Sequence, residues 1–140
     1  DNRVVVENLE GFEPVESFED PGGFDSDSYL EAVASKALVG DMDVSYNILV
    51  NDGVFGTCDY DFAGTLIDQM PALTIRDYEQ NHKEILGYDF GEDDLKSKTG
   101  EIAREVDEEE LEEILASFDL LTESGYKDRM VENVREAQNW

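Results

Sequence analysis

The stretch VSYNILVNDGVFGTCDY, residues 44–60, decides the fold class of this chain. Apolar residues recur at every second position from Val44 to Val50, which is the period of a strand with one buried face. Residues 51–53 follow with the sequence Asn-Asp-Gly, and these residue types adopt the positive φ angles of a tight turn at little cost. A second apolar run begins at Val54. The stretch therefore predicts an antiparallel hairpin over 44–60.

Helical patterns surround this hairpin, and a β-branched run at 3–7 predicts a short first strand. The expected helices are one that opens at Asp25–Ser28 and stops at Gly40, one that opens at Asp61 and is ended by Pro71, one over Thr74–Leu86 closed by Gly87, and a weak one over Asp93–Ala103 interrupted by Gly100. Residues 88–91 are expected to form a loop.

The last third of the chain predicts a helical hairpin. Asp107 and Glu110 have the spacing of a capping box, and an apolar stripe with helical period begins at Leu111. A turn at Glu123-Ser-Gly125 leads into a second amphipathic helix. Together these patterns predict a single α+β domain over 1–140, in which helices pack on a small antiparallel sheet.

Residues 8–25 form an acidic and aromatic arm that matches neither a helix nor a central strand. Phenylalanine and valine recur every third residue, which is the period of polyproline II. Three outcomes are open: the arm folds back on its own core, stays disordered, or docks in a neighbouring subunit. The partner-binding candidates are Phe12, Pro14, Val15, Phe18 and Phe24.

Acidic residues dominate the composition. The chain has 36 acids and 10 bases, for a net charge of −26, and the excess is spread along its whole length. Such a surface suits concentrated salt, because the Debye length falls from about 10 Å at 0.1 M to about 3 Å at 1 M. It also suits a partner with a basic groove, in which carboxylates imitate phosphates. Direct nucleic-acid binding is not expected, because the chain lacks a basic stripe.

The densest acidic run predicts a negatively charged surface at the start of the C-terminal hairpin. Its interpretation as a phosphate-like ridge competes with that of an ordinary solvated helix face, which we favour. The residues are Asp107, Glu108, Glu109, Glu110, Glu112 and Glu113.

No residue pattern indicates catalysis or a cofactor. His82 is the only histidine, so any Ser–His–acid or Cys–His mechanism must use it, and no sequence feature places Cys58, the only cysteine, beside it. Residues 41–52 resemble a calcium loop, but Tyr46 stands where the loop needs glycine, and the stretch predicts a strand. We therefore expect no enzyme, no metal site and no cofactor.

The sequence as a whole predicts a non-enzymatic, salt-adapted interaction protein that is part of a larger assembly such as a virus particle. Its partners would be other protein subunits, including copies of itself, and its location the cytoplasm or a virion. No stretch has the length and apolar content of a membrane span. The alternative is an inhibitor that mimics DNA, of the anti-restriction or anti-CRISPR type, or an acidic immunity protein that blocks a basic site.

Overall fold

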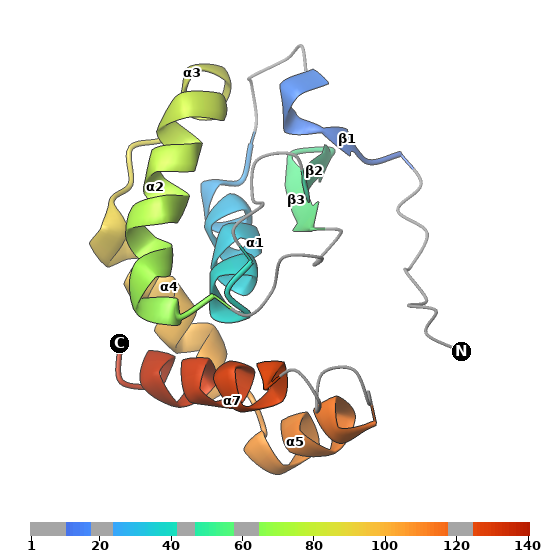
Figure 1. Cartoon of the computed structure of the whole chain (residues 1–140). Coiled ribbons are helices and arrows are strands. Elements are labelled where there is room, and N and C mark those ends of the chain that lie inside the picture. The colour runs from blue at the N-terminus through green and yellow to red at the C-terminus, as the bar shows by residue number, and fades with distance from the viewer. Residues whose placement is uncertain (1–10, 18–23, 42–46, 58–64, 118–124) are drawn as a thin grey trace.

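The computed structural model describes residues 11–17, 24–41, 47–57, 65–117 and 125–140, with the backbone alone at Tyr126. Within these ranges the chain is a mixture of helices and a small antiparallel sheet, so the predicted α+β class is confirmed (Figure 1). Some predicted features lie outside the described residues: the strand at 3–7, Phe18, the outer ends of the hairpin, Cys58 and the expected helix start at Asp61.

The sheet contains three strands in the order β1-β2-β3. β2 (Ile48–Asn51) and β3 (Val54–Thr57) form the predicted hairpin, in the register that pairs Asn51 with Val54. Asp52 and Gly53 connect them with φ angles of 51° and 76°, as a two-residue hairpin turn requires. β1 (Glu13–Pro14) pairs antiparallel with the other edge of β2, and the 3-10 turn η1 (Val15–Ser17) follows it directly.

The helices account for most of the described chain. They are α1 (Ser26–Leu38), α2 (Met70–Asn81), α3 (Lys83–Leu86), α4 (Glu92–Arg104), α5 (Glu108–Ala116) and α7 (Tyr126–Ala137), with a 3-10 turn η3 (Ile67–Gln69) before α2. α1 contacts both β3 and α4 and is the central helix of the fold. α5 and α7 lie next to each other at one end of the molecule, as the predicted C-terminal helical hairpin requires (Figure 1).

The ends of α1 follow the sequence signals. The Asp25 carboxylate accepts hydrogen bonds from the amides of Asp27 and Ser28, which otherwise have no partner within the helix. Gly40 ends the helix with a φ of 72°. A Cβ atom at this position would lie 2.0 Å from the Thr65 carbonyl oxygen, so glycine is required here for space as well as for conformation.

The core has two clusters. The larger is aromatic and joins α1 to the sheet, to α2 and to the loop after α3; its centre is Tyr29, which is fully buried and in ring contact with Phe55, Tyr78 and His82. The smaller cluster is aliphatic and holds α7 against α1, η3 and α4 through Leu38, Ile67, Ala103, Val134 and Ala137. The second cluster positions the C-terminal hairpin on the body of the protein.

The prediction that Pro71 ends a helix was wrong. Pro71 lies in the first turn of α2, where its missing N–H is not needed and its fixed φ angle suits the helix. Before it, Leu66 has an extended backbone. Residues 65–67 are held against α7. The buried Asn133 side chain accepts a hydrogen bond from the Ile67 amide at 3.0 Å and donates one to the Thr65 carbonyl at 2.9 Å.

Gly100 does not interrupt α4, which runs without a break from Glu92 to Arg104. The glycine is there for space: a Cβ atom would lie 2.7 Å from the Trp140 carbonyl oxygen and 2.9 Å from that of Ala137. Close packing of α4 on the end of α7 therefore depends on this position. Among the helices described, none combines the length and hydropathy of a membrane span.

Candidate functional site

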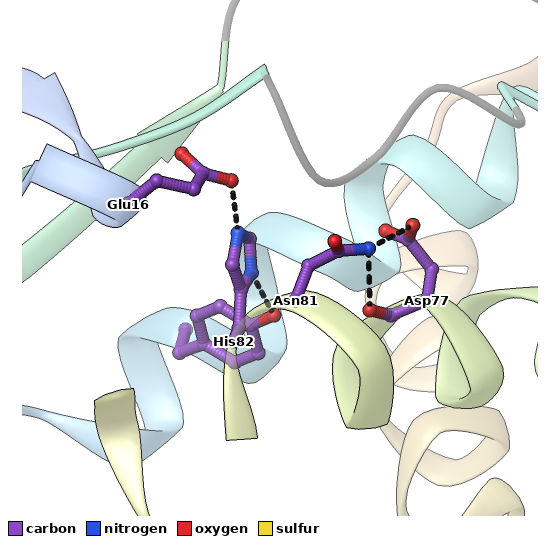
Figure 2. Close-up of polar contacts among 5 residues, drawn as sticks. Glu16, Asp77, Asn81 and His82 are labelled. Atoms are coloured by element: carbon purple, nitrogen blue, oxygen red, sulfur yellow. Dashed lines mark hydrogen bonds and ion pairs between the residues drawn. The ribbon is translucent and has the colours of Figure 1, made fainter. Parts of the chain in front are cut away.

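His82 is the chain's only histidine and lies between α2 and α3, where it is fully buried. Its Nε2 atom is 2.7 Å from Glu16 Oε1, and its Nδ1 atom is 2.8 Å from the Tyr29 hydroxyl. Figure 2 shows Glu16 reaching from η1 toward the imidazole ring. Three segments that are distant in the sequence, η1, α1 and the α2–α3 junction, thus meet at one ring.

The two neighbours of the ring determine where its protons lie. An ionised carboxylate only accepts hydrogen bonds, so Nε2 carries the hydrogen that Glu16 accepts. The Tyr29 hydroxyl can donate to a neutral Nδ1 or accept from a protonated one, because a hydroxyl does both. Both ring nitrogens of His82 therefore have a hydrogen-bond partner.

Burial keeps the tyrosines of this cluster neutral. Desolvation raises the pKa of Tyr29 well above its usual value, and neighbouring Tyr78 and Asp77 raise it further. Desolvation also raises the pKa of Tyr78 to about 12, with a smaller opposing contribution from the backbone of Tyr88. Both hydroxyls therefore stay protonated at neutral pH.

Asp77 and Asn81, which come before His82 in the last turn of α2, form a separate polar contact. Asn81 Nδ2 lies 3.0 Å from Asp77 Oδ1 and 3.1 Å from the Asp77 carbonyl oxygen (Figure 2). The contact is local to α2. Glu16 and Tyr29 are hydrogen-bond partners of the imidazole ring.

The partner-binding candidates of the arm have different environments. Val15 is fully buried in the aromatic core, and Phe24 packs against that core with its ring 5.5 Å from Phe55. Pro14 is exposed in β1, and Phe12 is partly buried beside Gly56. Residues 13–17 thus fold back on their own chain, with β1 and η1 where the three-residue period had suggested polyproline II.

The acidic candidates have three kinds of environment at the start of α5 and along it. Asp107 is the N-cap, and its carboxylate accepts from the amides of Glu109 and Glu110. Glu108 pairs with Arg135 of α7 through two nitrogens of the guanidinium group, and Glu112 Oε1 lies 3.8 Å from the same group. The side chains of Glu109, Glu110 and Glu113 are exposed.

Ile114 differs from its expected place in the apolar stripe of this helix. Its side chain is 52% exposed, whereas Leu115 is buried. α5 contacts α7, and its Leu111 packs against the aliphatic cluster, whereas Ile114 is left exposed among the described residues.

Sequence reasoning missed a buried ion pair. Lys36 Nζ lies 3.2 Å from Asp41 Oδ2, and both side chains are fully buried at the end of α1. Asp41 was the first residue of the calcium-like pattern, and in the fold it faces a lysine instead. The position of Lys36, within the apolar run from Val33 to Leu38, was the one available signal of its burial.

One surface hollow, of about 410 Å³, lies between α5 and α7 and is lined by both acids and bases, among them Glu112, Lys127 and Arg135. Within the described ranges, no group of three or more histidine, cysteine or acidic side chains is arranged to hold a metal ion. Comparison with family models, curated proteins and solved structures gave no match to this chain.

Proposed function

We propose that this protein is a non-enzymatic, acidic interaction protein adapted to concentrated salt. The observation that carries the proposal is the distribution of carboxylates over the fold. Exposed acids occur on η1, α1, α2, α3, α4, α5 and α7 and in the hairpin turn, so the negative charge is not confined to one face.

This distribution has a physical cost in dilute solution. Like charges repel across the whole surface, and with 36 acids and 10 bases most carboxylates have no basic residue to pair with. Salt reduces the repulsion, because the screening length falls from about 10 Å at 0.1 M to about 3 Å at 1 M. A surface of this kind suits a protein whose solvent is itself rich in ions.

The environment of the histidine supports the non-enzymatic part of the proposal. His82 has no exposed surface, and both of its ring nitrogens face groups of the protein itself. General acid or base catalysis requires a group within hydrogen-bond reach of a substrate. The imidazole ring has a structural role, because its two hydrogen bonds join η1 to α1.

Thermal unfolding in KCl tests the salt adaptation. The melting temperature should rise steeply as KCl is raised from about 0.1 M to about 3 M. Light scattering would follow the mass of the protein in solution in the same samples. Sucrose at matched osmolality is the control, since it stabilises by exclusion without screening charge. A melting temperature that is already high at low salt and barely changes would contradict the proposal.

A second candidate function is imitation of nucleic-acid phosphates, and one observation favours it. Arg135 attracts Glu108 and Glu112 toward α7, whereas Glu109, Glu110 and Glu113 are exposed on the same helix. An unpaired row of this kind would face the basic groove of a nucleic-acid enzyme, or a basic toxin. Binding would then weaken steeply with added salt.

A matched pair of triple variants separates the two functions. For a phosphate mimic, changing Glu109, Glu110 and Glu113 to glutamine should abolish inhibition of a restriction endonuclease. The control triple, Glu31, Glu79 and Glu84 to glutamine, removes the same charge from other exposed positions and should preserve inhibition. If the two triples behave alike and differ from wild type only in salt dependence of unfolding, the carboxylates serve the solvent.

A further inference from the structure

Residues 13–17 form a strap that is attached to the body of the protein at few points. β1 is only two residues long and pairs with β2 at Val50 and Leu49. Pro14 has no N–H to contribute to a ladder. Val15 is the one buried residue of η1, and Ser17 is exposed. Both residues of β1, Glu13 and Pro14, are exposed as well.

The remaining attachment is the contact between Glu16 and His82. The His82 side chain is completely buried, whereas 29% of the Glu16 side chain is exposed, so the carboxylate lies on the solvent side of the ring. Tyr29 lies at the other nitrogen and is itself fully buried. Glu16 is therefore the group through which the strap covers the imidazole.

We propose that the strap opens and closes as one unit over His82, and that the Glu16–His82 hydrogen bond is the latch that keeps it shut. Segments with a short ladder and few buried side chains open at lower free energy than packed helices. The strap has these properties, whereas α1 alone contributes Tyr29, Ala32, Val33 and Ala34 to the aromatic core. Opening exposes the imidazole and the edge of β2, and closing withdraws both from solvent.

The presence of a single histidine makes the opening measurable. Diethyl pyrocarbonate modifies accessible imidazoles, so its rate of reaction with His82 reports the population of the open strap. Wild-type protein should react slowly compared with the unfolded chain. Glu16→Ala should react about ten-fold faster, since loss of a hydrogen bond to an ionised group is worth about that factor.

Glu13→Ala is the matched control. Glu13 is an exposed acid of the same strap, so its loss changes the net charge equally but leaves the latch in place. The rate of this variant should equal that of wild type. An equal acceleration in both variants would show a general loosening and would overturn the proposal, as would a wild-type rate equal to that of the unfolded chain.

A reversible lock tests the same movement with the latch intact. Pro14 and Leu49 are paired positions of β1 and β2, so cysteines there, in a Cys58→Ser background, can fasten the strap by a disulfide. The oxidised protein should react more slowly than the reduced protein. If oxidation closes the disulfide and the rate of His82 modification does not change, access to the ring does not depend on the strap and the proposal fails.

Discussion

The carbonyl oxygen of Trp140 lies so close to Gly100 that a Cβ atom on Gly100 would be 2.7 Å from it. The same carbonyl accepts a hydrogen bond of 2.9 Å from Arg104 Nη1, one turn further along α4. The two contacts fasten the end of the α7 segment to α4. A residue that looks like a weak point in the sequence is therefore a point of close packing.

Gly100→Ala tests this relationship through the sign of its effect. Helix propensity alone predicts stabilisation by about 1 kcal/mol, whereas overpacking against the two carbonyls predicts destabilisation by about 1–3 kcal/mol. We expect destabilisation, measured by urea unfolding. Ser97→Ala, at an exposed position of the same helix, is the control and should be neutral or slightly stabilising. A Gly100→Ala protein more stable than wild type would contradict the packing described.

The buried pair of Lys36 and Asp41 should show strong coupling. Lys36→Met or Asp41→Asn alone breaks this fully buried contact, and breaking a buried ion pair typically costs about 3–5 kcal/mol. The double variant should lose less than the sum of the two, because both single changes remove the same contact. Free energies of unfolding for the four proteins of this cycle provide the measurement, and additive losses would show that the two side chains stabilise the fold independently.

Alkaline pH should unfold the protein through its buried tyrosines. In the folded protein the pKa of Tyr78 is about 12, whereas a free tyrosine side chain has a pKa of 10. The folded state therefore favours the protonated form. This contribution to stability is complete below pH 10 and is lost as the pH rises from 10 to 12. Stability should fall across that window, and tyrosinate absorbance should rise in two stages. Titration of all six tyrosines in one step near pH 10 would show that Tyr78 is not protected.

Asp107 allows capping to be separated from charge. Asp107→Ala removes the acceptor for the Glu109 and Glu110 amides and should destabilise the protein by about 1 kcal/mol. Asp107→Asn keeps an acceptor at the same place and removes one negative charge, so its stability should match or exceed that of wild type. Thermal unfolding of both variants in the same salt gives the comparison. Equal losses in both would show that the charge at the N-terminus of α5 matters more than the cap.

Local signals predicted most elements because the interactions behind them are local. The turn at Asp52 and Gly53, the cap at Asp25 and the stop at Gly40 each involve residues a few positions apart, so their residue types were enough to indicate them. Pro71 and Gly100 were misread because each residue type has two structural meanings. A proline suits the first turn of a helix as well as the position after its last residue. At Pro71 the preceding segment is bound by Asn133, which is distant in the sequence.

The sequence by itself determined the fold class, the hairpin, the ends of α1 and the acidic surface, because periodicity, turn chemistry and net charge are properties of short segments and of composition. Only the tertiary structure decided which groups meet in the interior. Glu16 and His82 are 66 positions apart, and Lys36 reaches Asp41 only once α1 has ended. A buried polar group needs a partner, but with 36 acids available the sequence cannot indicate which carboxylate supplies it, because that depends on how the segments pack.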